Sequence, residues 1–301
     1  MLIVLGNACA DVTYHLASLP RAGETLIAQR IAGDLGGKGF NQAVAARRAG
    51  ANLRFVAPVG DDATARAIRA ALRAEAIDDG DLIARAGPSD SSVILVDATG
   101  ESAIVSDTRQ AEALDPADLS KRLGLARGDI LLLQGNLSGE STSAAARLAR
   151  AAGARVVLNA APLCDWAASL SGSIDMLIVN RLEAAGWTGG DVKDDLAAMV
   201  DRIDVNMVAV TLGGEGCFLR RRDGVCRAIA APRVNAIDAT GAGDVFSGVF
   251  VAEWLATDDP LGAAELAVAA ASDKVTRAGT FSALPSRATI ERLRAARQGA
   301  T

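Results

Sequence analysis

The chain has 301 residues, of which 50% are hydrophobic, 3% aromatic and 22% charged, and its formal net charge is −5. This composition excludes a disordered chain and suffices for one large domain or two ordinary ones. A net negative charge gives no general attraction to nucleic acid or acidic lipid, so we expect neither as a partner. Because His15 is the only histidine, a metal site made of several histidines is also excluded.

The cysteines and the first residues indicate a cytoplasmic protein. The four cysteines are widely separated and form no C-x-x-C pair, and a chain of this size needs no disulfides to fold. The start of the sequence lacks the basic lead and long apolar stretch of a secretion signal. No uninterrupted run of about 18 apolar residues predicts a membrane span. We therefore expect a cytoplasmic globular protein.

Short aliphatic runs alternate with longer helical patterns along the chain. The runs lack regular polar alternation, which is typical of strands covered on both faces. Strands are predicted at Leu2–Leu5, Leu53–Val59, Ser92–Val96, Ile130–Leu133, Val156–Asn159, Met176–Val179 and Met207–Leu212. Helices are predicted at Asn41–Ala49, Thr64–Ala76, Ser141–Ala152, Leu196–Ile203, Ala242–Leu255 and Leu261–Arg277. This order predicts an α/β fold: a mostly parallel central sheet, helices on both faces, and ligands at the carboxyl ends of the strands.

Two segments, Asp11–Leu35 and Ser89–Asp107, interrupt this alternation. Both contain turn residues, such as Asp97–Gly100, and neither has a helical period. We predict that they pair into a small antiparallel β sheet that forms a lid over the active site. Two unrelated surface hairpins are the alternative. No linker or internal repeat divides the chain, so we expect residues 1–301 to form one domain with the lid inserted in it.

A glycine-rich segment, Gly36–Ala46, leads into the helix predicted from Asn41. Its glycines allow the backbone to approach a polar ligand without a side-chain clash. The segment is not a P-loop, because no Ser or Thr follows Lys38, and a dinucleotide fingerprint would follow the first strand directly. We interpret it as a binding loop, with an ordinary glycine turn before a helix as the alternative.

A second segment of small residues, Gly241-Ala242-Gly243-Asp244, begins a predicted helix. The first N–H groups of a helix have no internal partner and lie at the positive end of its dipole. Here they can bind the oxygens of a transferred phosphoryl group. Asp244 lies in the first turn, where a carboxylate can accept a proton from a hydroxyl that attacks phosphorus. A capping role for Asp244 is the alternative.

Together, Gly36–Ala46 and the later Asp238–Gly248 resemble the ribokinase-type branch of the PfkB carbohydrate kinase family. The resemblance extends from Leu5 to Gly279, which is essentially the whole chain. It implies a ribokinase-like fold and the transfer of the γ-phosphoryl group of ATP to a hydroxymethyl group of a ribose-like pentose. Asp244 is then the general base that activates the sugar hydroxyl, which agrees with the interpretation of the helix start.

The resemblance also assigns roles to further residues. The anion hole for the γ-phosphoryl group is assigned to the backbone of Gly241, Ala242 and Gly243. Sugar contacts are assigned to Asp11, Gly37, Lys38, Asn41 and Asn136. Nucleotide and phosphate contacts are assigned to Asn180, Glu183, Thr211, Gly213 and Gly216, and Glu183 is expected to help hold Mg²⁺ through water. A potassium site of mostly backbone oxygens is assigned to Asp238, Thr240, Lys274, Arg277 and Gly279.

Two departures from the family pattern concern the acceptor. Cys9 stands where ribokinases usually have a sugar-binding asparagine, and Asn136 where they usually have glutamate. A site built for particular hydroxyls discriminates strongly against mismatched partners. A ribonucleoside, a pseudouridine-like compound or another ketose is therefore an alternative substrate, with Tyr14 and Phe40 as candidates for stacking on the base of a nucleoside.

An alternative from another class is a non-catalytic sugar or nucleotide sensor on a kinase fold. The intact Asp244 and its glycine-rich loop argue against it, because a sensor needs no base. We also expect a homodimer through the lid, since the lid strands of this family often pair across a two-fold axis and an exposed sheet edge needs covering.

Overall fold

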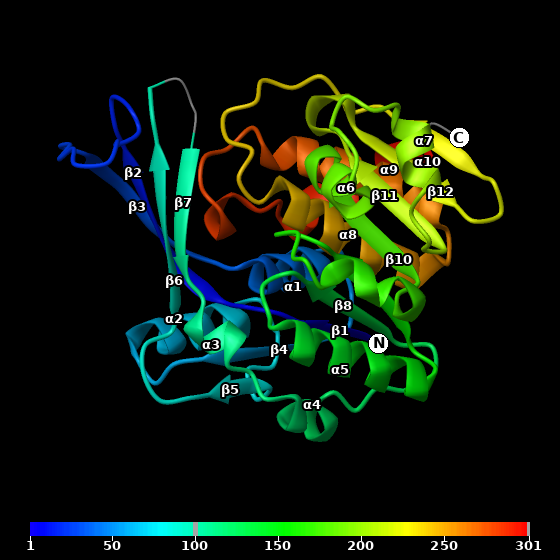
Figure 1. The fold of residues 1–301 in the computed structure, drawn as a ribbon, viewed down its shortest axis with the longest axis horizontal. Helices are drawn as coiled ribbons and strands as arrows, with labels where there is room; N and C mark the ends of the chain where they lie inside the picture. Colours follow the sequence, from blue (N-terminus) through cyan, green and yellow to red (C-terminus); the bar gives the residue numbers. More distant parts are fainter. Residues whose placement is uncertain (99–101, 300–301) are drawn as a thin grey trace.

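The computed structural model describes residues 1–98 and 102–299. Within them, the strands of the larger sheet are β1 (Leu2–Leu5), β4 (Leu53–Val59), β5 (Leu82–Ala84), β8 (Ile130–Gln134), β9 (Arg155–Asn159), β10 (Met176–Asn180), β11 (Met207–Thr211), β12 (Cys217–Arg221) and β13 (Cys226–Ile229). Their order is β13-β12-β11-β10-β9-β8-β1-β4-β5 (Figure 1). The pairs β11–β12 and β12–β13 are antiparallel and the other pairs are parallel, so the predicted mostly parallel sheet is confirmed.

Helices cover both faces of this sheet, as predicted. One face is covered by α1 (Lys38–Arg48), α2 (Ala63–Ala74), α8 (Ala242–Thr257), α9 (Pro260–Lys274) and α10 (Arg287–Gln298). The other is covered by α3 (Arg109–Glu112), α4 (Pro116–Arg122), α5 (Gly139–Ala152), α6 (Arg181–Thr188) and α7 (Leu196–Asp201). Short 3₁₀ turns lie at Ala167–Ser173, Gly213–Glu215 and Phe281–Ala283. In the described part of the chain, none of the helices has the length and apolar character that a bilayer crossing requires.

Strand β1 illustrates why the sequence shows no polar alternation. Its residues point alternately to the two faces of the sheet. Leu2 and Val4 pack with the helices of one face, and Ile3 and Leu5 with those of the other; all four are fully buried. A strand covered on both sides needs apolar residues at every position, which is the pattern read in the sequence.

The two segments that interrupt the alternation form a separate small sheet. Its strands are β2 (Cys9–His15), β3 (Gln29–Gly36), β6 (Asp90–Val96) and β7 (Ser102–Asp107), in the order β3-β2-β6-β7. This sheet projects from one side of the molecule (Figure 1). The outer pairs are antiparallel and the central pair, β2–β6, is parallel. The predicted small sheet is confirmed in place of two unrelated hairpins; positions 99–101, and with them part of the predicted turn Asp97–Gly100, lie outside the described residues.

The fold differs from the prediction at a few positions. Helix α1 begins at Lys38, three residues before the predicted Asn41. Its first turn is held there by the carbonyl of Asn7, which accepts a hydrogen bond from the Phe40 amide at 3.0 Å. Asp11, the first residue of the predicted lid segment, lies within β2, which begins two residues earlier at Cys9. The short elements β5, β12, β13, α3, α4 and α6 and the terminal helix α10 were not predicted.

The parallel strands bring polar residues together at one edge of the large sheet. Strands β8, β9, β10 and β11 end in Gln134, Asn159, Asn180 and Thr211. Gln134 is in register with Asn159, and Asn180 with Thr211. Ligands of open α/β sheets bind beyond these carboxyl ends, so this edge is where a site is expected.

Candidate active site

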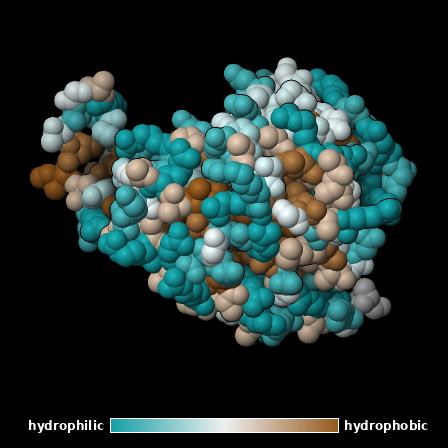
Figure 2. Space-filling view, turned by 90° about the horizontal axis from the view of Figure 1, so that it is seen from below, coloured by the Kyte–Doolittle hydropathy of each residue, from teal (hydrophilic) through white to brown (hydrophobic). Residues whose placement is uncertain are grey.

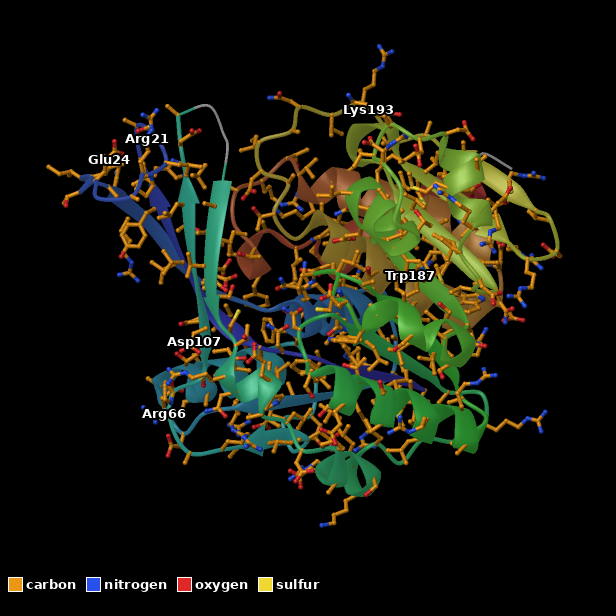
Figure 3. The ribbon with its side chains drawn as sticks, viewed as in Figure 1. Arg21, Glu24, Arg66, Asp107, Trp187 and Lys193 are labelled. Carbon is orange, nitrogen blue, oxygen red and sulfur yellow. The ribbon has the colours of Figure 1, made fainter. Side chains whose placement is uncertain are left out.

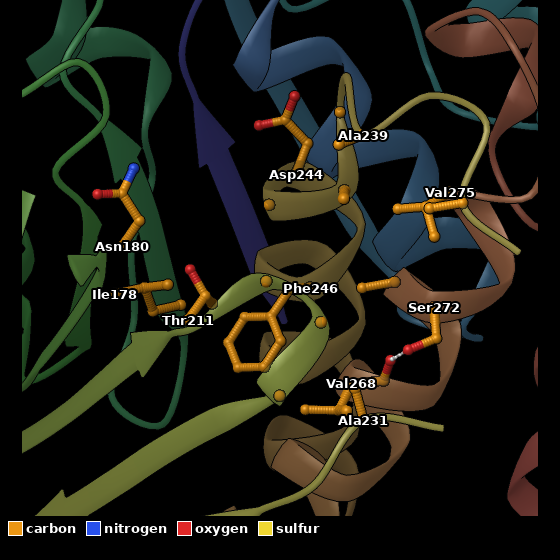
Figure 4. Close-up of a pocket in the computed structure, with 18 of the residues that line it drawn as sticks. Ile178, Asn180, Thr211, Ala231, Ala239, Asp244, Phe246, Val268, Ser272 and Val275 are labelled. Atoms are coloured by element: carbon orange, nitrogen blue, oxygen red, sulfur yellow. Dashed lines mark hydrogen bonds between the residues drawn. The ribbon is translucent and has the colours of Figure 1, made fainter. Parts of the chain in front are cut away.

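A cavity of about 840 Å³ opens at this edge (Figure 4). Its size is in the usual range of small-molecule sites. Asp244 and Asn180 lie toward one end of it, and Phe246, Val268 and Ser272 toward the other (Figure 4). The predicted residues that line the cavity are Lys38, Asn180, Glu183, Thr211, Gly213, Gly216, Gly241, Ala242, Gly243 and Asp244. The cavity therefore brings together the segments expected to bind phosphates and nucleotide.

Asp244 occupies the first turn of α8 and is only 5% exposed. Each of its carboxylate oxygens accepts a hydrogen bond from a side-chain amide of α1. Asn41 Nδ2 donates to Oδ2 at 3.1 Å, and Gln42 Nε2 donates to Oδ1 at 3.0 Å. Two amides from one rigid helix fix the orientation of the carboxylate, so it is not simply a cap of its own helix.

Gln42 belongs to a larger buried amide network behind Asp244. Its Nε2 also donates to Asn159 Oδ1 at 2.9 Å, and its Oε1 accepts from Gln134 Nε2 at 2.9 Å. Asn159 in turn donates to the carbonyl of Ile178 at 3.1 Å. Gln42 is fully buried, and Gln134 and Asn159 are nearly so. Such a network resists reorientation of any one member, because turning one amide leaves its neighbours unpaired.

The start of α8 provides free backbone amides beside Asp244. The N-cap residue Gly241 has φ 78°, a left-handed conformation that favours glycine. The Ala242 amide donates to the Ala239 carbonyl at 3.1 Å. Of the three amides assigned to the anion hole, those of Gly241 and Gly243 have no acceptor among the described residues. These two N–H groups remain available for an anion at the helix N-terminus.

Lys38 and Glu183 face the same end of the cavity as Asp244. Glu183 and Asn180 form a reciprocal capping box at the start of α6, with both hydrogen bonds at 2.8 Å. Burial raises the pKa of Glu183, the Asn180 amide and the positive charge of Lys38 oppose that rise, and the carboxylate of Asp244 adds to it. The side chains of Lys38, Glu183 and Asp244 therefore lie close enough in the cavity lining to influence one another's charge.

The side of the site expected to bind the sugar is separate from this cavity. Asp11, Gly37, Asn41 and Asn136 are not among its lining residues. Asp11 is buried on β2, and burial raises the pKa of its carboxyl, an effect that the thiol of Cys9 partly offsets by donating to Oδ1 at 3.2 Å. The charge of Asp244 also raises the pKa of Asp11, so the two carboxylates act on each other electrostatically.

Three other predicted sugar contacts, Gly37, Asn136 and Asn41, differ in their surroundings. Gly37 caps α1 with φ 95°, and a Cβ there would lie 2.8 Å from the Asn7 carbonyl oxygen, so glycine is required for close approach. Asn136 has a buried side-chain oxygen, Oδ1, without a donor in the described part of the chain. Asn41 donates to Asp244 as described above, and its own Oδ1 is also buried without a donor.

The aromatic candidates for stacking on a base have different environments. Phe40 is fully buried, and its ring contacts those of Phe55 and Phe281 edge-on at centroid distances of 6.3 and 5.2 Å. The suggestion that Phe40 stacks on a ligand is therefore wrong, since the ring belongs to the core. Tyr14 lies half-buried on β2 opposite Arg30 of β3.

The residues assigned to a potassium site lie in the loop that precedes α8, at the end of α9 and in the loop that follows α9. Asp238 accepts from the Thr240 amide at 2.8 Å and from the Gly279 amide at 2.9 Å, so its carboxylate joins two loops. The Lys274 ammonium donates to the Asp238 carbonyl oxygen at 2.9 Å. The carbonyl of Lys274, an expected ion ligand, accepts from the Arg277 amide at 3.1 Å.

A model of the pfkB family of carbohydrate kinases matches residues 1–287. The chain belongs to this family. Ribokinase of Haemophilus influenzae is 34% identical over 293 residues, and deoxyribokinase of Salmonella typhi is 30% identical over 295; each alignment covers 95% of both chains. The structure of Arabidopsis thaliana ribokinase complexed with ribose and ATP has a TM-score of 0.85 at 25% identity, covering 97% of this chain and 98% of that one.

These findings confirm the predicted family, the ribokinase-like fold and the enzyme class, a phosphotransferase with an alcohol acceptor. Within this pfkB kinase, reasoning from the sequence missed Gln42, Gln134 and Asn159. The latter two carry a readable signal, because a polar residue ends each apolar run at the carboxyl edge of the sheet. Gln42 carries none, since a glutamine near the start of a helix is ordinary.

Proposed function

We propose that this protein phosphorylates a hydroxymethyl group of a ribose-like pentose with ATP. In the reaction, the Asp244 carboxylate accepts the proton of the sugar hydroxyl as its oxygen attacks the γ-phosphorus. A bond forms between that oxygen and phosphorus, the bond from phosphorus to the β–γ bridging oxygen breaks, and ADP leaves. The acceptor-free amides of Gly241 and Gly243 offset the charge that develops on the transferred group.

The observation that carries this proposal is the placement of Asp244. Its carboxylate is buried beside free helix amides and held at both oxygens by Asn41 and Gln42, with the lining of an 840 Å³ cavity around it. A structural aspartate at a helix start needs neither amides from another helix nor a cavity. The arrangement is suited to take a proton from a hydroxyl placed at the anion site.

ATP fits the rest of the cavity. Thr211, Gly213 and Gly216 line it at and after the end of β11, and Val268 and Ala271 line it from α9, which gives the adenine an apolar wall. The ribokinase of Arabidopsis thaliana was solved with ribose and ATP, and the present chain has the same fold.

The donors beside the phosphate end suit Mg²⁺. Magnesium takes one or two carboxylates together with phosphate oxygens and water. Glu183 provides one carboxylate next to Lys38 and Asp244, and only its Oε2 is engaged in the capping box with Asn180. When bound with ATP, the ion would neutralise phosphate charge there.

Potassium does not fit equally well. Asp238 is one of the residues assigned to the ion, and its carbonyl oxygen already accepts a hydrogen bond from the Lys274 ammonium, which lies 3.9 Å from its Oδ2. We therefore derive no step through potassium.

The acceptor we favour is ribose or a closely related pentose. The relatives named above are a ribokinase and a deoxyribokinase, so the 2-hydroxyl is the point on which they differ by name. The burial of Phe40 removes one of the two aromatic residues that favoured a nucleoside. The hydrogen bonds that Asn41 and Gln42 donate to Asp244 argue against a sensor role, because a sensor needs no oriented base.

The test is an ATP-consumption screen over pentoses, 2-deoxypentoses, hexoses and nucleosides, with NMR to locate the phosphate on the product. Asp244→Asn should keep the fold and nucleotide binding and lower turnover by about 10²- to 10⁴-fold, the usual contribution of a general base. The proposal would be refuted if Asp244→Asn kept a turnover close to that of the unmodified enzyme. It would also be refuted if the unmodified enzyme consumed no ATP with any acceptor in the panel.

We also propose a homodimer formed through the small sheet. Apolar side chains gather on this projecting sheet, at the left of Figure 2, and Val93 and Val105, which face each other on β6 and β7, are 39% and 68% exposed. A second copy of the chain would bury them. Sedimentation should therefore report a dimer that Val105→Asp converts to a monomer; a monomer at all concentrations of the unmodified chain would contradict this.

A further inference from the structure

Lys274 is an unusual lysine. It is one of four in the chain, it ends helix α9, and its side chain is fully buried. Lysine is almost never fully buried unless it is paired, because removing an ammonium from water is costly. Burial accordingly lowers the pKa of the Lys274 ammonium, while the carboxylate of Asp238 raises it. The mechanism proposed above makes no use of this group.

The ammonium lies at the junction of two loops. It donates to the Asp238 carbonyl oxygen at 2.9 Å, and it lies 3.9 Å from Oδ2 of the same residue. That Oδ2 accepts from the Gly279 amide of the second loop. The loop that begins at Asp238 continues directly into Gly241, the N-cap of α8. Lys274 therefore holds the segment that presents the anion hole.

The charges around the ammonium favour a single cation at this point. The carboxylates of Asp238, Asp244 and Asp34 all stabilise the charged form of Lys274, and Arg277 opposes it. Asp34 reaches the same region from β3 of the small sheet, where it accepts from the amides of Thr280 and Ser282 at 3.2 and 3.0 Å. A cation placed here would contact the loop that begins at Asp238 and the loop that contains Gly279. It would also add positive potential near the N-terminus of α8.

A monovalent metal ion and a lysine ammonium compete for this place. Both carry one positive charge and both bind oxygen atoms. Asp238 is among the residues that the family resemblance assigns to potassium, and its carbonyl oxygen accepts a hydrogen bond from Nζ of Lys274. A second cation on this oxygen would meet an unscreened like charge in a buried site.

We propose that the Lys274 ammonium replaces the monovalent cation in this kinase, so that turnover requires no potassium. The expected effect on turnover rests on the proposed function. The expected effect on cation binding rests on the buried ammonium alone. Lys274 is a positioning residue: it acts through the Asp238 loop and does not touch the reacting atoms.

The experiment measures turnover and thermal stability in choline chloride and in potassium chloride at equal ionic strength. The unmodified chain should have the same turnover and the same melting temperature in both salts. Lys274→Ala, which opens space at the site, should lose about tenfold or more in turnover in choline, since a hydrogen bond to a charged group is worth that factor. Potassium or ammonium chloride should restore most of the loss and raise the melting temperature of this variant.

Two further variants separate this role from a general structural one. Lys274→Met fills the space without a charge, so potassium should restore neither its turnover nor its stability. Lys193→Ala removes an exposed lysine that projects from the surface (Figure 3), and it should behave as the unmodified chain does.

Several results would overturn the proposal. Activation of the unmodified chain by potassium, or a rise in its melting temperature, would mean that a metal ion binds beside Lys274. Full turnover of Lys274→Ala in choline would mean that no cation is needed. If Lys274→Ala does not fold, the comparison of the two salts on the unmodified chain still decides. If no acceptor is phosphorylated, the proposed function fails, while the melting temperatures still test the cation site.

Discussion

The buried amide of Gln42 gives the sharpest test of how Asp244 is held. We consider Gln42→Met, which keeps the length of the side chain and removes its donor and acceptor. Asp244 Oδ1 then loses the hydrogen bond that Gln42 Nε2 donates at 3.0 Å. A hydrogen bond to a charged group is worth about 1.5–3 kcal/mol. If that bond orients the base in the transition state, the turnover number falls by about 10- to 150-fold.

The same substitution also affects stability, and the two effects can be separated. It leaves Asn159 Oδ1 without its donor and Gln134 Nε2 without its acceptor. Each unpaired buried group costs about 1–3 kcal/mol, so the free energy of unfolding should fall by about 2–6 kcal/mol. Gln134→Met is the matched control. It removes one bond of the same network and leaves both hydrogen bonds to Asp244 in place.

The assay compares kcat and KM of both variants at saturating ATP and acceptor, with urea unfolding as the measure of stability. Gln42→Met should lower kcat and leave the KM for ATP unchanged, because Gln42 does not line the nucleotide cavity. Gln134→Met should be destabilised with kcat close to normal. The reasoning is refuted if Gln42→Met keeps a normal kcat, or if both variants lose kcat equally.

Two more outcomes follow from the site. Burial raises the pKa of Asp11, so its charged form destabilises the native state above that pKa, and this cost is absent below the ordinary aspartate pKa near 3.9. Asp11→Asn should therefore be more stable than the unmodified chain at pH 7, and this difference should vanish toward pH 3. Its KM for the sugar should rise. Equal stability of the two proteins to urea at pH 7 would contradict this reasoning. Glu183→Gln keeps a side chain that can complete the capping box with Asn180, so the fold should persist. Its Mg²⁺ requirement should rise by about an order of magnitude, measured by titrating the metal at fixed ATP; an unchanged requirement would exclude Glu183 as a metal contact.

The start of α8 could be predicted because its chemistry is local. Gly241, Ala242, Gly243 and Asp244 are adjacent in the sequence, and the unpaired amides of a helix start exist wherever the helix begins. The large sheet could be predicted for a similar reason, since strands such as β1 are continuous aliphatic runs. Helix α3 could not, because four residues make too short a period to recognise.

The hydrogen bonds that hold the site residues in place join distant parts of the chain, so no local sequence pattern predicts them. The partners of Gln42 lie 92, 117 and 202 positions away. Lys274 was assigned to the potassium site through its backbone, whereas its buried side chain binds Asp238. A lysine in the last turn of a helix is ordinarily a solvated complement to the helix dipole, so its burial was not apparent.

The close approach of two helices explains how the side-chain amides of α1 reach Asp244 on α8. Gly248 lies one turn after Asp244, and a Cβ at this glycine would lie 2.4 Å from the Gln42 carbonyl oxygen. The absence of a side chain there lets the backbones meet at the level of Gln42. From that position the Gln42 amide is 3.0 Å from the carboxylate of Asp244. Gly248 therefore sets, through packing, the distance between the helix that carries Asp244 and the helix whose Gln42 amide binds it.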